Sequence, residues 1–344
     1  MGSLLSGGQP GREGAVREGL GWLGHDGTGA VPLRPLLLGN GPATRSLHHR
    51  RAQYVKSGMP IGLMVGASSQ SMPETGSDTK EVSTMPEMAK HEFGTFNWLD
   101  LSTTDIEGAK AFYGAMFGWE FEPQVVEGEL VYTICTLNGL QVCGLGGTMG
   151  ENDPPGWNVY TCVEDVDAAS NRAVELGGKI EAGPMDIFDS GRMSFISDPQ
   201  GAMLGLWQPR EHLGVQVMFE PGTFMWAEIM TWNAEGTNAF YQGLHGWDTI
   251  ADHNNPNYTL YVPGGDTSRT VYLAGQLAMD ENFDKSIPTY WGIYLQVSDT
   301  AETLRRCIEL GGEQVMPTTE IAQGTFAVMK DPQGAYFNVL QPSH

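Results

Sequence analysis

Basic residues are scarce in this chain of 344 residues, and the scarcity is concentrated after residue 90. From His91 onward there are 10 Lys and Arg residues against 34 Asp and Glu residues, whereas residues 1–90 carry 9 basic and 7 acidic residues. A body this acidic repels nucleic acid and anionic membrane surfaces, because affinity for either depends on neutralising phosphates. We therefore expect no nucleic-acid or membrane partner, and a small-molecule ligand that is neutral or cationic.

Cysteine is also sparse, and long apolar runs are missing. The four cysteines lie inside apolar stretches and show no CxxC spacing: Cys135, Cys143, Cys162 and Cys307. In a large chain this pattern indicates buried thiols in a reducing compartment, so we expect a cytoplasmic protein. No apolar run reaches the length needed to cross a bilayer.

Residues 1–90 lack any sustained apolar period and are rich in Gly, Ser, Pro and Arg. Such a segment cannot bury enough apolar surface to offset the entropy of ordering. We predict a disordered N-terminal extension over residues 1–90.

The remainder of the chain contains an internal repeat. The segment from Gly94 to Trp119 returns 128 positions later, from Gly222 to Trp247. Both copies carry Gly-Thr-x-x-Trp, then Ala-Phe-Tyr, then Gly-Trp. One repeat is one supersecondary unit, and the copies are expected to pack together.

Each copy begins with a strand and a helix. Residues 96–103 alternate as a strand does, and residues 105–117 place apolar side chains on one helical stripe. Asp105 is the expected N-cap of this helix, and Gly118 occupies the position of a glycine that closes it. Shorter strand-like runs follow, so the unit is predicted to be βαβββ.

A related unit begins at Trp157 and recurs in the second half from Gly292. Its helices are predicted over residues 166–176 and 300–310, and Asp-Pro-Gln-Gly follows in each copy, as suits a type I turn. Four βαβββ-like units therefore form two related halves, 91–209 and 221–342. Residues 209–221 are the expected connector.

Paired βαβββ units with these motifs resemble the vicinal oxygen chelate superfamily, which includes glyoxalase I, bleomycin resistance proteins and extradiol dioxygenases. The resemblance covers about Phe93 to Pro342, and the tandem arrangement is most similar to two-domain glyoxalase-like proteins of bacteria. It implies an α+β fold in which the four units form two glyoxalase-like domains. Each domain would have a curved mixed sheet around a cleft, with helices on the convex face.

Members of that superfamily with lyase or dioxygenase activity hold a divalent metal through His, Gln or Glu side chains in the cleft. The positions carried over by register are Trp98, Asn158 and Gly205 in one half, and Trp226, Gly292 and Asn338 in the other. Trp and Gly offer no side-chain lone pair, and Asn is a poor ligand for zinc or iron. We predict no metal and no other cofactor, with a divalent metal as the alternative.

No histidine is expected to complete a metal site. His91 and His212 precede or connect the units, His245 lies beside a helix end, and His253 lies in an Asn-rich loop. All four are therefore placed outside the strands that line the clefts.

Strand alternation places Trp98 and Asp100 on the concave face of the first domain, and Trp226 and Glu228 on that of the second. The tryptophans would form an aromatic wall for a flat or cationic ligand, or else fill a cavity that lost its metal. The carboxylates are catalytic candidates, since an acid in an apolar cleft has a raised pKa and can act as a base or pair with a cation. Alternatively, a neighbouring tyrosine or amide satisfies them.

The same alternation brings further ligand-binding candidates to the clefts. They are Asn158, Tyr160 and Trp207 in the first domain, and Tyr294 and Asn338 in the second. Tyr132, Tyr160 and Tyr294 could donate hydrogen bonds to a ligand carbonyl, or else lie at the edge of the core. The leading hypothesis is a monomer or homodimer that binds a small molecule in aromatic-walled clefts without a catalytic metal, as bleomycin resistance proteins do. The alternatives are a metal-dependent lyase similar to lactoylglutathione lyase, a dioxygenase, a cofactor-free isomerase using Asp100 or Glu228, or a structural dimerisation module.

Overall fold

The computed structural model describes residues 88, 90–150, 153–253, 255–266 and 271–343. The extension predicted over residues 1–90 lies outside the described residues apart from Met88 and Lys90. Within the described ranges the chain forms four helices and two sheets. No helix in these ranges is long and apolar enough to span a membrane.

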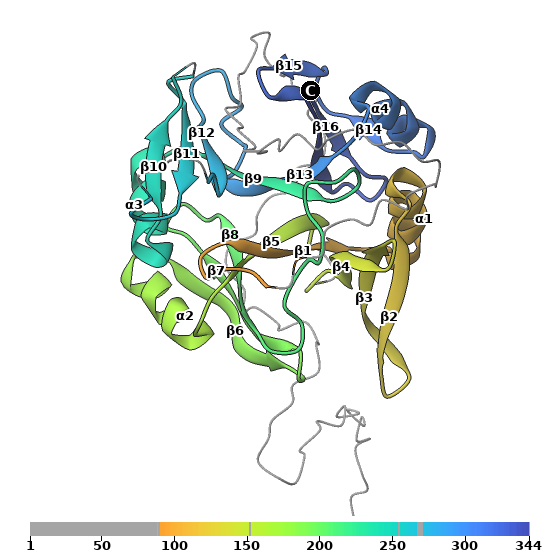
Figure 1. Cartoon of the computed structure of the whole chain (residues 1–344), viewed down its shortest axis with the longest axis horizontal. Coiled ribbons are helices and arrows are strands. Elements are labelled where there is room, and N and C mark those ends of the chain that lie inside the picture. Colours follow the sequence, from red (N-terminus) through yellow and green to blue (C-terminus); the bar gives the residue numbers. More distant parts are fainter. Residues whose placement is uncertain (1–87, 89, 151–152, 254, 267–270, 344) are drawn as a thin grey trace, which may run out of the picture. The chain divides into compact units, whose positions relative to one another are not determined.

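The first half builds an eight-stranded sheet in the order β2-β3-β4-β1-β5-β8-β7-β6 (Figure 1). Its strands are β1 Phe96–Thr103, β2 Glu120–Val126, β3 Glu129–Leu137, β4 Leu140–Gly147, β5 Gly156–Cys162, β6 Lys179–Ile187, β7 Gly191–Ser197 and β8 Met203–Pro209. Its helices are α1 Ile106–Phe117 and α2 Val166–Glu175. The central strands β1 and β5 are antiparallel, and each has a parallel neighbour, β4 and β8.

The second half repeats this topology in the order β10-β11-β12-β9-β13-β17-β16-β14, with β15 paired to β16. Its strands are β9 Phe224–Thr231, β10 Asp248–Ala251, β11 Tyr258–Val262, β12 Ala274–Ala278, β13 Tyr290–Gln296, β14 Glu313–Gln314, β15 Thr319–Ile321, β16 Gly324–Lys330 and β17 Tyr336–Pro342. Its helices are α3 Ala234–His245 and α4 Thr300–Glu309. Figure 1 shows each helix on the outer side of its curved sheet. The α+β fold of two glyoxalase-like sheets is confirmed.

The helix boundaries follow from local chemistry. Asp105 caps α1 by accepting the Gly108 amide at 2.9 Å, and Asn233 caps α3 by accepting the Gly236 amide at 3.0 Å. Gly118 ends α1 in the left-handed conformation, where a side chain would be strained. The predicted start and end of α1 are thus confirmed.

Strand alternation in β1 separates two faces. Leu99 and Leu101 are almost fully buried in the main hydrophobic core. Trp98 and Asp100 project from the opposite face, where they contact polar groups of neighbouring strands. The concave face is therefore the one that carries chemistry.

The repeated motif joins the two halves to each other. The indole N–H of Trp119 donates to the backbone carbonyl of Gly222 at 2.8 Å, and the indole N–H of Trp247 donates to that of Gly94, also at 2.8 Å. Each copy of Gly-Trp thus binds the Gly-Thr segment of the other copy. The motif is conserved between the repeats because it is a reciprocal structural contact.

The tyrosines of the repeat make a second reciprocal contact. Tyr113 on α1 donates its hydroxyl to Asp331 in the second Asp-Pro-Gln-Gly turn at 3.0 Å, and Tyr241 on α3 lies near Asp198 in the first, but without a hydrogen bond of normal geometry to its Oδ2. Asp331 Oδ1 also accepts three backbone amides of its own turn. The turns predicted as structural therefore also dock the opposite helix.

The connector lies against the first sheet. The Val215 amide donates to the Asn97 carbonyl at 2.8 Å, and the Gln216 amide donates to the Gln141 carbonyl at 2.8 Å. Gly214 has a φ of 127°, and a Cβ there would lie 2.2 Å from the Asn97 oxygen. The segment predicted to link the halves is therefore held tightly by the first domain.

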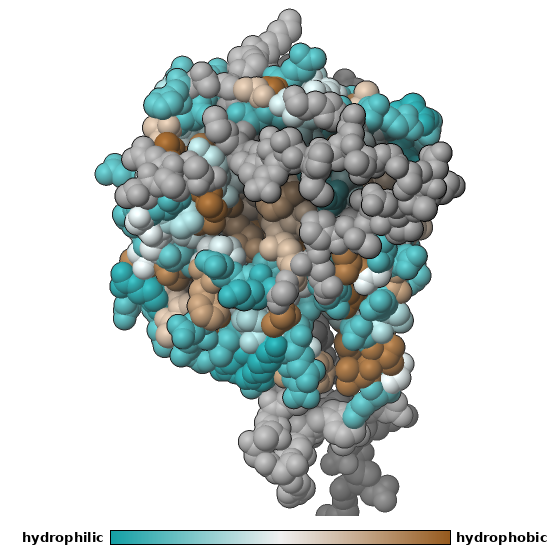
Figure 2. Space-filling model, in the orientation of Figure 1, coloured by the Kyte–Doolittle hydropathy of each residue, from teal (hydrophilic) through white to brown (hydrophobic). Residues whose placement is uncertain are grey.

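The surface seen in Figure 2 is mainly hydrophilic, as the acidic composition implies. Separate apolar patches interrupt it, and an apolar recess lies near the middle of this face. The exposed large apolar side chains are scattered along the described sequence, from Phe93 to Tyr336. Scattered apolar side chains of this kind are normal for a protein surface.

Candidate functional site

The first cluster is centred on the Asp100 carboxylate of β1 and comprises Trp98, Asp100, Tyr132, Asn158 and Tyr160. Tyr160 donates its hydroxyl to Asp100 at 2.8 Å, Tyr132 donates at 3.0 Å, and Asn158 donates its amide at 2.8 Å. Trp98 in turn donates to the Tyr132 hydroxyl at 3.0 Å. Burial raises the pKa of Asp100, and the three donors oppose the shift.

Glycines make room for these tyrosine rings. A Cβ at Gly144 would lie 1.9 Å from the Tyr132 hydroxyl, and one at Gly205 would lie 2.0 Å from Cδ1 of Tyr160. Gly205 is the position that the family resemblance assigns to a metal ligand, and the Tyr160 ring now lies over it. At this position the absence of a side chain makes room for the Tyr160 ring, and no metal ligand is present.

The connector covers the first cluster with a histidine. The His212 ring meets Trp98 edge-on at a centroid distance of 4.3 Å, and the Trp207 indole N–H donates to the His212 carbonyl at 2.9 Å. Burial, with His91 nearby, lowers the pKa of His212 to about 4, so its ring is neutral at neutral pH. Trp98, Trp207 and the connector thus pack together on the first concave face.

The second cluster is centred on Glu228 of β9 and comprises Trp226, Glu228, Tyr258 and Tyr294. Tyr294 donates its hydroxyl to Glu228 Oε1 at 3.1 Å, and Tyr258 also lies within hydrogen-bonding reach of the carboxyl group. Trp226 donates to the Tyr258 hydroxyl at 3.3 Å. The two clusters therefore share one plan, an acid between two tyrosines with a tryptophan behind one of them.

The acids of the two clusters differ in how fully they are satisfied. Asn158 pairs with Asp100 across the strands, but Gly292 occupies the equivalent position opposite Glu228 and supplies no amide side chain. Glu228 Oε2 is buried and accepts no hydrogen bond of normal geometry among the described residues, although the Tyr258 hydroxyl lies near the carboxyl group. Burial raises the pKa of Glu228 to about 7, with the tyrosines opposing the shift. The second cluster contains an acid that titrates near neutrality.

Apolar side chains pack beside the second cluster. Its Trp226, Tyr258 and Tyr294 belong to a hydrophobic core of eight buried residues, and Phe283, on the loop between β12 and β13, packs against that core, as do Tyr272 and Met230. Trp232 holds that loop through its indole N–H, which donates to the Ile287 carbonyl at 2.7 Å. Partly buried side chains, that of Phe283 on this loop among them, lie over the second cluster. The connector over the first cluster is held instead by backbone hydrogen bonds to its sheet.

The other candidates have structural partners. Asn338 donates its amide to the Ile293 carbonyl at 2.9 Å, and Cys162 is a buried thiol whose pKa burial raises to about 11. Asp100 and Glu228 bind different pairs of tyrosines in different sheets, so they do not form one acid pair. The structure thus groups the candidates into two separate clusters.

The residues at the metal positions do not fit a divalent metal. Trp98 and Trp226 use their only polar atom as a hydrogen-bond donor, and Gly205 and Gly292 have no side chain. Within the ranges that the structure describes, no group of three or more His, Cys, Asp or Glu side chains is arranged to hold a metal ion. Divalent metals need several lone-pair donors, and these positions offer only the amide oxygens of Asn158 and Asn338, one in each domain and both poor ligands for zinc or iron.

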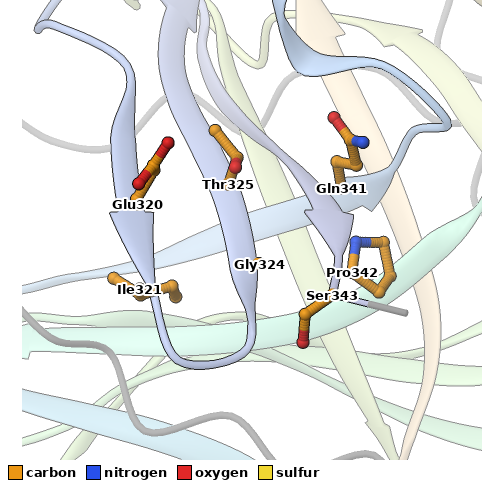
Figure 3. A pocket seen from close by; sticks show the side chains of 7 residues that line it. All are labelled: Glu320, Ile321, Gly324, Thr325, Gln341, Pro342 and Ser343. Atoms are coloured by element: carbon orange, nitrogen blue, oxygen red, sulfur yellow. The ribbon is translucent and has the colours of Figure 1, made fainter.

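A hollow of about 240 Å³ lies at the ends of β15, β16 and β17 (Figure 3). Figure 3 shows Glu320, Thr325 and Gln341 on neighbouring strands, with their side chains projecting to the same side. Gln341 accepts the backbone amide of Thr300 at the start of α4, which places this hollow on the helix side of the sheet. It is therefore separate from the cluster around Glu228.

Both halves match known families. Residues 95–206 match the Glyoxalase/Bleomycin resistance protein/Dioxygenase superfamily, and residues 227–340 match the Glyoxalase-like domain. The chain is 37% identical over 267 residues to a Mycobacterium tuberculosis protein provisionally named as the glyoxylase CFP32, covering 75% of this chain and 99% of that protein. This chain belongs to the glyoxalase, bleomycin resistance protein and dioxygenase superfamily.

Two further similarities are more distant. The anthracycline biosynthesis protein DnrV of Streptomyces peucetius is 28% identical over 272 residues, covering 74% of this chain and 95% of DnrV. The Mn(II)-bound glyoxalase from Novosphingobium aromaticivorans is similar in structure with a TM-score of 0.51 and 13% identity, covering 72% of this chain and 82% of that chain. At that identity the structural similarity concerns the fold alone.

Sequence reasoning missed two residues of the clusters. His212 was placed in the connector, and Tyr258 was not among the candidates. Tyr258 could have been found by aligning the two halves, because it takes the place of Tyr132 beside the acid. His212 has no such signal, since its contacts depend on how the connector folds back.

Proposed function

We propose that this chain binds a small organic molecule on the concave face of the second domain, without a divalent metal. The observation that carries the proposal is the Glu228 carboxyl group. It is buried among aromatic side chains, and its Oε2 accepts no hydrogen bond of normal geometry among the described residues. An unsatisfied buried polar atom is costly, and a ligand that supplies the missing partner would recover that cost.

The first domain is the less suitable site. Asp100 already has three hydrogen-bond donors, and His212 of the connector fills the space against Trp98. We propose that the first cluster is structural and that binding is confined to the second. This arrangement predicts one ligand per chain.

The names of the relatives support a small organic ligand. One is provisionally named as a glyoxylase, and another is an anthracycline biosynthesis protein. Aromatic ligands suit a site whose walls include Trp226, Tyr258 and Tyr294. The described cysteines are all free and buried, which supports a reducing, cytoplasmic location.

The test is a thermal-shift screen of metabolites, anthracyclines among them, followed by calorimetric titration of the hits. We expect Glu228→Gln to weaken binding and Asp100→Asn to lower stability without comparable loss of affinity. Binding that depends on Asp100 and not on Glu228 would place the site in the first domain and refute the proposal. Near-stoichiometric Mn, Fe, Ni or Zn in purified protein would refute its metal-free part.

A second candidate function is catalysis by Glu228 as a general base. The observation that favours it is the pKa of about 7, which gives both protonation states near neutral pH. In that case the chain would be a cofactor-free isomerase acting on a carbon acid held in the same site. Turnover that survives Glu228→Gln would exclude this function.

A further inference from the structure

Glu228 is a buried acid without a counter-ion. It is 4% exposed, and the groups that touch its carboxyl oxygens are the neutral hydroxyls of Tyr294 and Tyr258. Among the described residues it takes part in no ion pair, whereas eight ion pairs join residues elsewhere. Ionised carboxylates leave water readily only when a charge or several donors compensate them.

The side chain that compensates the acid of the first cluster has no equivalent in the second. In the first cluster this side chain is Asn158, and in the second the equivalent residue is Gly292. A Cβ built on Gly292 would have its nearest neighbour, the Asn338 amide nitrogen, at 3.4 Å. The glycine therefore supplies no donor where the first domain places one, and a methyl group there would make only ordinary van der Waals contacts.

The surroundings of the Glu228 carboxyl group suit a cation. The rings of Trp226, Tyr258 and Tyr294 belong to the cluster, and Tyr272 and Phe283 pack against it. Aromatic faces attract ammonium groups, most strongly where water is excluded. The excess of acidic residues after residue 90 also draws cations toward the domain.

Resting on the proposed function, we propose that the second site takes a ligand bearing a protonated amine on an apolar body, with the ammonium paired to Oε2 of Glu228. The apolar body contacts the aromatic cover, and the ammonium supplies the counter-ion that the fold lacks. A neutral donor such as a hydroxyl could satisfy the oxygen but would leave the charge uncompensated. Charge, rather than hydrogen bonding alone, is thus the basis of selection.

The experiment compares matched ligand pairs that differ only in charge. Calorimetry at about pH 8 would titrate 2-phenylethylamine against 2-phenylethanol, and the naphthylmethyl and cyclohexylmethyl amines against their alcohols. The proteins are the wild type, Glu228→Gln, and Glu235→Gln as a control on the exposed first turn of α3. We expect at least one amine to bind the wild type about tenfold or more tightly than its alcohol, because only the amine pairs with the acid.

The expected pattern in the variants is specific. Glu228→Gln should bring each amine to the affinity of its alcohol, and Glu235→Gln should leave the preference unchanged. Lowering the pH to about 6 should weaken amine binding to the wild type, since the acid becomes protonated while the amine stays charged. The titratable groups nearest to this acid and its tyrosines are Tyr258, Tyr294, Tyr290 and Asp252.

Two results would overturn the inference. Equal affinity of amines and alcohols, with both sensitive to Glu228→Gln, would show a neutral ligand site and leave the proposed function intact. Failure of every amine to bind the wild type would also overturn it. The proposed function fails separately if every hit of the metabolite screen binds wild type and Glu228→Gln equally well.

Discussion

At Glu228 the folded protein holds a carboxyl group whose pKa burial raises from 4.5 to about 7. Below pH 4.5 the acid is protonated in both the folded and the unfolded chain, so burial costs nothing. Between these values only the unfolded chain releases the proton, and the folded state loses stability as the pH rises. The acid therefore weakens the fold under the conditions in which it can bind a cation.

The first prediction follows from this sign. Relative to Glu228→Gln, the wild type should lose about 3 kcal/mol of unfolding free energy between about pH 4.5 and pH 7.5, because one pKa unit corresponds to 1.36 kcal/mol. Urea unfolding of both proteins over that range measures the difference. A difference independent of pH would show that the acid is not desolvated as the structure indicates.

A second residue-scale prediction concerns the glycines of the second cluster. A Cβ at Gly275 would lie 1.8 Å from the Tyr258 hydroxyl, whereas one at Gly292 meets nothing closer than 3.4 Å. Gly275→Ala should therefore cost about 1–3 kcal/mol and displace Tyr258 from Glu228. Gly292→Ala is the matched control and should be nearly neutral in thermal unfolding. Equal melting temperatures for the two variants would contradict the packing described.

At the scale of elements, the two clusters differ in what covers them. The connector over the first makes backbone hydrogen bonds to β1 and β4. The loop between β12 and β13 is anchored at its start by the Met279 amide, which donates to the Thr231 carbonyl, and by Asn257, which donates to Asp280. Beyond that point it is held by the side chain of Trp232, whose ring also lies 3.8 Å beneath the Lys285 ammonium. Side-chain contacts of this kind open more readily than a backbone ladder.

The third prediction is that Trp232 controls the opening of this loop. Trp232→Phe keeps a ring for Lys285 but loses the bond to Ile287, and Trp232→Ala loses both. Hydrogen exchange of the amides in residues 280–289 should accelerate in the order wild type, Phe, Ala. Exchange in the connector at residues 212–217 should stay unchanged, and equal acceleration in both segments would point to global destabilisation instead.

How much of the fold and of the site the sequence predicts depends on whether the contacts join residues close together or far apart along the chain. Strand β1 and helix α1 were predictable because alternation, an aspartate cap and a closing glycine are local signals. The faces of Trp98 and Asp100 follow from the same alternation. The cover of His212 over Trp98 was not predictable, since residues more than a hundred positions apart meet there. The unpaired oxygen of Glu228 likewise depends on the absence of a side chain at Gly292.

For the whole molecule, the reciprocal contacts between the halves imply that they unfold together. Trp119→Phe and Trp247→Phe each remove the indole N–H and part of a buried ring, so each should cost about 2–4 kcal/mol, and the double variant should show about the sum. Differential scanning calorimetry of the wild type should show one transition. Two resolved transitions in the wild type would contradict this fourth prediction.

The reciprocal hydrogen bonds that Trp119 and Trp247 donate to the Gly-Thr segments of the opposite halves bear on how such a chain can arise. The hydrogen bond that Trp119 donates from the first half to the second has a counterpart in the opposite direction, donated by Trp247. That reciprocity is the property of an isologous interface with two-fold symmetry. Two separate half-length polypeptides could pair through the same atoms, so the covalent link between them supplies proximity rather than new contacts. The two halves differ most in their chemistry at the acids, since Asp100 faces Asn158 and Glu228 faces Gly292.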